Sequence, residues 1–199
     1  MEKDPLRVPI GEGAPAELGG MLDEHRERLK RLVAFRMDRR LAQRVDASDV
    51  IQETFAEASR RFPEFLRHDN MPFFVWLRLL TQQRLATLHR HHLARAARDA
   101  HRETPLDADV SNTSTALADR LVDRHTDPGD AAAREEIRER LRLALGTMDP
   151  VDREVLALRH FEELTNAETA AVLGLQTSAA SKRYVRALER LRELMTEFF

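Results

Sequence analysis

One segment, residues 165–186, constrains the fold of this chain more than any other. It reads TNAETAAVLGLQTSAASKRYVR. Thr165 and Glu168 have the T-x-x-E spacing of a capping box, which starts a helix. Gly174 suits the left-handed position that ends a helix, and a second helix is expected to begin at Thr177 or at the residue before it. The pattern therefore predicts two helices joined by a tight turn.

The second of these helices has two unlike faces. At helical spacing, its inward stripe is expected to be Ala180, Tyr184, Ala187 and Leu191. Its outward face then carries hydroxyl and basic side chains: Ser178, Ser181, Lys182, Arg183 and Arg186. A helix, a glycine turn and a basic helix are the helix-turn-helix arrangement, whose second helix enters the major groove of DNA. An ordinary helical hairpin with a solvated basic face is the alternative.

The charge of the chain is unevenly distributed. The net charge is −2, yet residues 84–102 hold five arginines and four histidines against one aspartate. Residues 103–136 hold nine acidic residues and three arginines, and residues 176–192 hold five basic residues and one acidic residue. Two basic stretches thus flank an acidic connector with a net charge of −6. Both basic stretches are candidate faces for binding a polyanion.

Length and composition exclude several protein classes. A chain of 199 residues, of which 42% are hydrophobic and 33% charged, can form one large or two small domains. The absence of cysteine rules out a disulfide framework, a thiolate metal site and a cysteine nucleophile. No apolar run approaches the roughly 20 residues of a membrane span, and the N-terminus has no signal-peptide core. We therefore expect a cytoplasmic protein without a membrane partner.

The remaining segments also follow helical patterns. An amphipathic helix is expected over about residues 22–44. A second helix follows Asp46 or Ser48 as a cap, and a third follows Asn70 with Pro72 in its first turn. The predicted fold is all-α, with two helical domains at 19–102 and 130–199. A loose N-terminal arm, 1–18, precedes them, and a weakly structured acidic linker, 103–129, joins them.

Two stretches in this order resemble the extracytoplasmic-function type of sigma factor, in the sigma-70 family. Residues 148–191, MDPVDREVLALRHFEELTNAETAAVLGLQTSAASKRYVRALERL, resemble its promoter-binding region 4. Residues 46–65, DASDVIQETFAEASRRFPEF, resemble the region 2 helix that docks on RNA polymerase, and FFVWL at 73–77 resembles the entry to the promoter-melting element. The resemblance implies a region 2-like bundle and a region 4-like helix-turn-helix.

The resemblance also implies partners and contact residues. Core RNA polymerase, through its β′ clamp helices and β flap, and promoter DNA are the implied partners, and an anti-sigma factor is a candidate. The implied polymerase contacts are Asp46, Asp49, Gln52 and Glu53, although acids at a helix start also simply complement the helix dipole. The implied −35 contacts are Thr177, Ser178, Ser181, Lys182, Arg183 and Arg186.

The −10 element is the other implied DNA site. Gln83, Arg84, Thr87 and Arg90 recur at helical spacing and form one polar face, which the resemblance places on the −10 element. Trapping an unstacked base needs hydrogen-bonding groups and a flat or apolar wall. Loop 67–70, with Arg67 and Asn70, supplies the first, and Phe73, Phe74 and Trp76 are candidates for the second, although Trp76 is expected in the core.

Nothing in the sequence indicates catalysis, a cofactor or a metal site. His89, His91 and His92 lack a carboxylate at ligand spacing, and His89 and His91 point apart on a helix. The predicted function is that of a sigma factor, which directs promoter recognition, strand opening and transcription initiation while the polymerase performs the chemistry. The main alternative is a stand-alone helix-turn-helix regulator with an N-terminal interaction domain, and a third is an anti-sigma decoy that keeps the fold without the DNA contacts.

Overall fold

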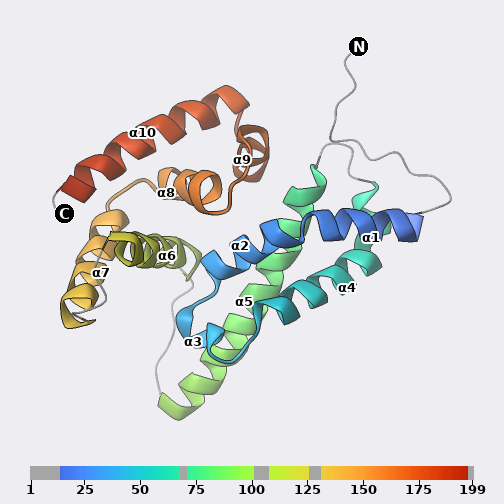
Figure 1. Cartoon of the computed structure of the whole chain (residues 1–199), viewed down its shortest axis with the longest axis horizontal. Helices are drawn as coiled ribbons and strands as arrows, with labels where there is room; N and C mark the ends of the chain where they lie inside the picture. The colour runs from blue at the N-terminus through green and yellow to red at the C-terminus, as the bar shows by residue number, and fades with distance from the viewer. Residues whose placement is uncertain (1–13, 68–70, 101–107, 126–130, 197–199) are drawn as a thin grey trace. The chain divides into compact units, whose positions relative to one another are not determined.

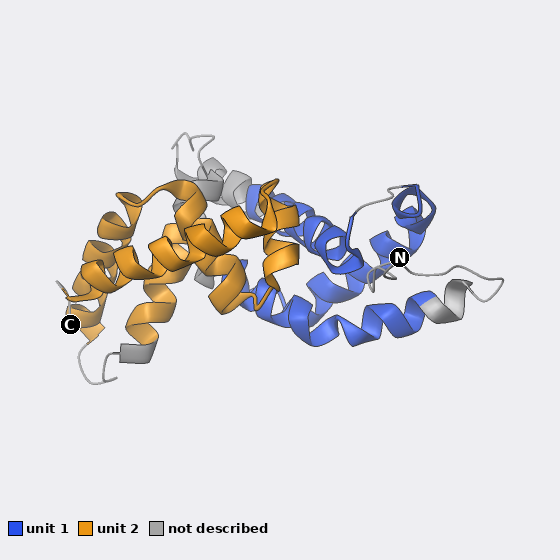
Figure 2. Cartoon of the chain, turned by 90° about the horizontal axis from the view of Figure 1, so that it is seen from above, with its two compact units in different colours: residues 1–101 blue, residues 102–199 orange. Residues whose placement is uncertain are grey.

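A computed structural model describes residues 14–67, 71–100, 108–125 and 131–196. Over these ranges the regular secondary structure is helical, which confirms the all-α prediction for them. The chain divides into two compact units, residues 1–101 and 102–199 (Figure 2). None of the described helices is long and apolar enough to cross a membrane.

The N-terminal unit is built around one long helix. Its elements are α1 (Ala14–Glu24), α2 (Arg26–Arg36), α3 (Arg39–Ala42), α4 (Ala47–Phe65) and α5 (Phe73–Ala100). Both α2 and α4 pack on α5 and on each other (Figure 1). Their apolar stripes form the core, in which Leu29, Leu32, Ile51, Ala58 and Leu77 are fully buried. This packing fixes α4 beside α5, the two helices on which the predicted polymerase and −10 contacts lie.

The first helices differ from the prediction in two ways. The segment expected as one helix over 22–44 is broken into α1, α2 and α3. The first break is at His25, a turn residue with φ −94° and ψ 0°, and the second is at Met37, where the backbone is extended with φ −76° and ψ 122°. The predicted arm 1–18 is also corrected, since α1 begins at Ala14 and buries Leu18. Residues 1–13 lie outside the described ranges. Because the segment is broken, α2 and α3 can each pack on α5, and α1 can pack on α2.

Aromatic side chains close one end of this core. Phe65 stacks on Trp76 with 4.8 Å between the ring centroids, and Phe73 meets Phe65 edge-on at 5.3 Å. Phe74 is buried beneath the Arg28 guanidinium, 3.5 Å from the ring centroid. The expectation for Trp76 is confirmed. The suggestion that Phe73 and Phe74 form the wall of a base pocket is corrected, because both rings are part of the core.

In the C-terminal unit, the described residues 108–125 and 131–196 form a second group of helices. They are α6 (Ala108–His125), α7 (Ala131–Gly146), α8 (Pro150–Leu156), the π-helical turn η1 (Ala157–Phe161), α9 (Asn166–Leu173) and α10 (Thr177–Thr196). Helix α6 packs on α7 and α8, and α10 packs on α8 and α9. Buried leucines from α7, α8 and η1 form the centre of this unit, among them Leu141, Leu145 and Leu158.

Helix α6 corrects the prediction of a weakly structured linker over 103–129. Its side chains Leu117, Ala118 and Val122 are fully buried. Asp119 accepts a salt bridge from Arg138 of α7 at 2.6 Å, so the acidity of this segment is partly neutralised within the unit. The Ser- and Thr-rich composition is poor for an isolated helix, but tertiary packing overrides weak propensity.

The predicted turn between α9 and α10 is confirmed in detail. The Thr165 hydroxyl accepts from the Glu168 N–H at 3.2 Å, and the Glu168 carboxylate accepts from the Thr165 N–H at 2.8 Å. Gly174 ends α9 in the left-handed conformation, with φ 63° and ψ 32°. The Leu175 N–H then bonds back to the Ala170 carbonyl at 2.9 Å, and these bonds hold the two helices at a defined turn.

Substituting Gly174 with alanine is expected to lower the free energy of unfolding by about 1 kcal/mol. A Cβ at this position has open space, so the cost comes from the left-handed backbone, which disfavours a residue with a Cβ by about 1–2 kcal/mol. Gly146→Ala is the matched control, because Gly146 is helical and also has open space. Urea unfolding of the two variants checks this. A loss for Gly146→Ala as large as that for Gly174→Ala would contradict the explanation.

Candidate nucleic-acid interface

Helix α10 presents a polar and basic face to solvent. Ala180 and Ala187 are fully buried against the unit, as the spacing predicts. Tyr184 is half-buried with the Arg159 guanidinium 5.3 Å from its ring centroid. On the opposite side, five of the six residues predicted for the −35 element are exposed: Thr177, Ser178, Ser181, Lys182 and Arg186.

The orientation of α10 is set by contacts at its start. The Asn166 side chain, at the first position of α9, donates to the Thr177 carbonyl at 2.8 Å. Thr169 is buried in α9, and its hydroxyl donates to the Thr165 carbonyl at 2.9 Å, so it carries no unmet hydrogen bond. The first turns of α10 therefore project from a rigid support, which is the geometry that a groove-reading helix requires.

Arg183, the sixth predicted residue, is engaged within the unit. Its guanidinium donates to Asp152 at 2.7 Å and to Asp149 at 3.3 Å, at the start of α8. The N–H of Val151, which donates to Asp149, lowers the pKa of that carboxyl, and Arg183 adds to the effect. The hydrogen bond to Asp152 in turn raises the pKa of Arg183. This side chain ties α10 to α8, in addition to any contact with phosphate.

Arg186 and Arg183 are therefore expected to differ in their effects on DNA binding. Arg186→Ala should reduce the dependence of log affinity on log salt by about 0.9, the share of one phosphate. Arg183→Ala should reduce this slope less and should also lower the unfolding free energy, because its guanidinium already bonds Asp152. Affinity for −35 duplexes at several salt concentrations, with urea unfolding, checks both effects. Equal slope changes for the two variants would show that Arg183 releases Asp149 and Asp152 when it binds DNA.

In the N-terminal unit, the four residues predicted for the polymerase lie exposed on the first turns of α4. Asp46 is the N-cap, and its carboxylate accepts from the Ser48 N–H at 2.7 Å. Asp49, Gln52 and Glu53 are exposed. The capping role of Asp46 is thus observed, while Gln52 and Glu53 have no part in capping. The exposed Gln52 side chain is available to a partner surface, whereas Glu53 already has a partner within the unit.

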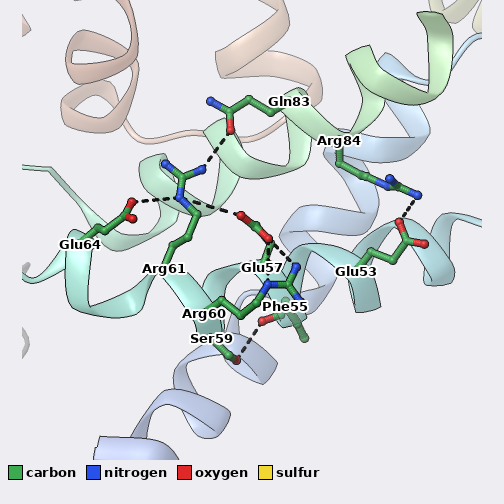
Figure 3. Close-up of polar contacts among 9 residues, drawn as sticks. All are labelled: Glu53, Phe55, Glu57, Ser59, Arg60, Arg61, Glu64, Gln83 and Arg84. Carbon is green, nitrogen blue, oxygen red and sulfur yellow. Dashed lines mark hydrogen bonds and ion pairs between the residues drawn. The ribbon is translucent and has the colours of Figure 1, made fainter. Parts of the chain in front are cut away.

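Figure 3 shows that this acidic helix meets the predicted −10 face of α5. Glu53 forms a salt bridge with Arg84, and the Arg61 guanidinium donates to the Gln83 side chain at 3.4 Å. Arg61 also bonds Glu64 at 3.1 Å, within α4. From the sequence, the polymerase contacts and the −10 contacts are predicted as two separate sites. In the structure, Glu53 of the polymerase site pairs with Arg84 of the −10 site.

The other −10 residues extend along α5. The Thr87 hydroxyl donates to the Gln83 carbonyl at 2.9 Å, and Arg90 donates to the Thr87 hydroxyl at 3.3 Å. Gln83 and Arg90 are exposed. Arg67 is exposed and donates to the Pro63 carbonyl at 3.2 Å, and Asn70 lies outside the described residues. Gln83, Arg84, Thr87 and Arg90 thus share one face, as their spacing predicts.

Sequence reasoning missed Val185 on the exposed face of α10. Its side chain is exposed, and it lines a shallow hollow of about 520 Å³ with Ser181, Lys182 and Arg186. The signal was present in the spacing, since Val185 follows Ser181 by four residues and Lys182 by three. From sequence alone, an apolar residue is normally assigned to the core. In the structure, Val185 is exposed instead.

Known proteins match the segment that forms this face. Residues 144–193 match the family described as Sigma-70, region 4. These residues are similar to region 4 of the sigma-70 family. The capped turn lies inside this match, as does α10 up to residue 193, and the predicted resemblance of residues 148–191 to region 4 of sigma factors is confirmed.

Relatives that match about three quarters of the chain are named as sigma factors. The probable RNA polymerase sigma factor RfaY of Xanthomonas campestris is 31% identical over 154 residues, which are 76% of this chain and 35% of RfaY. The RNA polymerase sigma factor CnrH of Cupriavidus metallidurans is 29% identical over 156 residues, or 75% of this chain and 73% of CnrH. The chain thus spans about a third of the length of RfaY.

Among solved structures, that of CnrH in complex with the cytosolic domain of CnrY is similar to this chain. It matches 92% of this chain and 90% of that chain, with a TM-score of 0.49 and 23% sequence identity.

Proposed function

We propose that this chain is an RNA polymerase sigma factor that directs core polymerase to promoters and opens them. The observation that carries the proposal is the region 4 domain, in which a capped turn holds α10 with Ser181, Lys182 and Arg186 exposed. Side chains in the first turns of a groove-inserted helix reach base edges. In this function the polymerase performs the chemistry, and the chain acts in the cytoplasm as a non-enzymatic subunit without a cofactor.

The N-terminal unit supplies the second half of the function. Gln52 and Glu53 bind the cationic clamp helices of the polymerase, and Gln83 and Thr87 face bases of the −10 element. Arg84 and Arg90 approach phosphates. The Glu53–Arg84 salt bridge is compatible with both roles, because an ion pair this exposed contributes only about 0–1 kcal/mol and exchanges easily for other partners.

Charge reversal at the start of α4 is expected to weaken binding to core polymerase. In the double variant Gln52→Ala with Glu53→Arg, the Arg-rich clamp surface meets a positive charge in place of the Glu53 carboxylate. The affinity for core polymerase should therefore fall at least tenfold. Helicity by circular dichroism should stay unchanged, because neither side chain caps α4. Glu64→Arg, an exposed charge reversal at the far end of α4, is the control and should retain binding. Co-purification of the double variant with core polymerase at wild-type yield would refute this placement.

DNA binding with and without polymerase distinguishes the proposal from a stand-alone regulator. The chain alone is expected to bind promoter duplexes weakly, and the complex with core polymerase to bind them tightly and to need both −35 and −10 elements. A regulator of the alternative class would bind tightly without polymerase, as a dimer on a palindromic site. Competition binding on duplexes that lack one element or the other measures this. Tight binding by the chain alone would overturn the proposal.

A further inference from the structure

Val185 has an exposure that the packing of its own unit does not explain. It lies on α10 with 52% of its surface exposed. The core side of this helix is formed by Ala180, Ala187 and Leu194, which are buried. A β-branched residue at an exposed helix position adds nothing to the core and slightly disfavours the helix. Val185 is therefore accessible to a ligand of α10 without any loss of core packing.

The surroundings of Val185 indicate what kind of ligand it contacts. The hollow of about 520 Å³ is lined by Ser181, Lys182, Val185 and Arg186. None of these four side chains is acidic. One turn further along, Glu189 is exposed and ends this basic surface. The arrangement is an apolar patch flanked by two cations and a hydroxyl, which fits an anionic ligand with an apolar group at its edge.

DNA offers one such apolar group in the major groove. Among the base edges there, the C5-methyl of thymine is the apolar feature, while the other features are hydrogen-bond donors and acceptors. Valine has neither donor nor acceptor and therefore reads only the methyl. We propose that Val185 contacts a thymine C5-methyl in the −35 element and makes this chain select thymine at that base pair. The inference rests on the proposed function and adds a specificity-determining residue to it.

The spacing of Lys182 and Val185 along α10 places them on different parts of the −35 element. A helix rises about 1.5 Å per residue, so Lys182 and Val185 lie about 4.5 Å apart along α10. This is close to the roughly 3.4 Å between successive base pairs. With α10 lying along the groove, this spacing lets Lys182 and Val185 contact neighbouring base pairs. Arg186, which follows Val185 directly, reaches the backbone beside them.

Replacing thymine by uracil removes only the methyl group and so tests this contact alone. The complex of the full chain with core polymerase is measured on its preferred −35 duplex, with each thymidine in turn replaced by deoxyuridine. We expect one position at which affinity falls about fourfold, the value of one buried methyl group. In Val185→Ala the ratio of the affinities for the thymidine and deoxyuridine duplexes should fall to about one. In Val185→Ile it should persist, because isoleucine keeps an apolar contact.

The control is an exposed apolar residue of the same unit away from α10. Leu143 on α7 is 58% exposed, and Leu143→Ala should retain the thymidine preference in full. A wild-type complex without a methyl preference at any thymidine would overturn this inference alone, as would a preference retained in Val185→Ala. A wild-type complex that binds DNA without any sequence preference would overturn both this inference and the proposed function.

Discussion

Replacing Leu117 with alanine is expected to lower the unfolding free energy of the C-terminal unit by about 2–5 kcal/mol. Leu117 is fully buried in α6, and α6 packs on α7 and α8. Removing its side chain leaves a cavity in the core, so the cost combines lost apolar burial with lost packing. A leucine in a weakly structured linker would cost almost nothing. The substitution therefore asks whether α6 belongs to the folded unit.

The chain contains its own reporter for this measurement. Trp76, its single tryptophan, is buried in the N-terminal unit. In urea, Leu117→Ala should shift part of the circular dichroism transition to lower concentration, while the Trp76 fluorescence transition stays in place. Leu143→Ala removes an exposed leucine from the same unit and should change stability by less than about 0.5 kcal/mol. Equal stabilities for the two variants would contradict the packing of α6.

Replacing Lys182 with alanine is expected to change the preference among −35 sequences by about 1–3 kcal/mol at one base position. Lys182 is exposed in the second turn of α10 and lines the hollow with Ser181 and Val185. An ammonium group placed there donates to acceptors on a base edge, and its loss removes discrimination at that base pair. The discrimination corresponds to roughly a 5- to 150-fold difference in affinity.

The comparison with Arg186→Ala separates base reading from phosphate binding. Arg186→Ala should weaken binding to all −35 sequences by a similar factor, because phosphates carry no sequence information. Competition across a library of −35 duplexes at two salt concentrations measures both variants. If Lys182→Ala gave the same uniform loss, α10 would be an electrostatic anchor, and specificity would come from the N-terminal unit or from DNA shape.

Local signals predicted the parts of the fold that depend on local chemistry. The capping box at Thr165, the left-handed Gly174 and the cap at Asp46 each involve bonds within a few residues. The core positions of Ala180 and Ala187 followed from helical periodicity. These features could be predicted because the residues that form them are also neighbours in the sequence.

The remaining features depend on contacts between distant residues. Arg183 pairs with Asp152, 31 residues away, and Glu53 pairs with Arg84 on another helix. Periodicity gives the face on which a charge lies but does not show which charge it will meet across an interface. The same reason explains why the sequence predicted Arg183 only as a −35 contact and not as a partner of Asp152.

Helix α6 shows how composition misleads when packing decides the structure. Its Ser- and Thr-rich start and acidic charge are typical of a linker, yet Leu117 and Val122 fall on one face and are buried. The spacing of Leu117, Ala118, Leu121 and Val122 carries the helical signal. In this stretch the apolar spacing was more informative than the average composition.

Run-off transcription with purified core polymerase tests the central proposal most directly. Core polymerase, with and without this chain, is given a library of genomic fragments, and the transcripts are sequenced. We expect transcripts that require the chain and share −35 and −10 elements upstream of their start sites. These transcripts should be lost in the double variant Gln52→Ala with Glu53→Arg. A chain that adds no transcript to core polymerase on any fragment, while binding DNA tightly by itself, would contradict the proposed function.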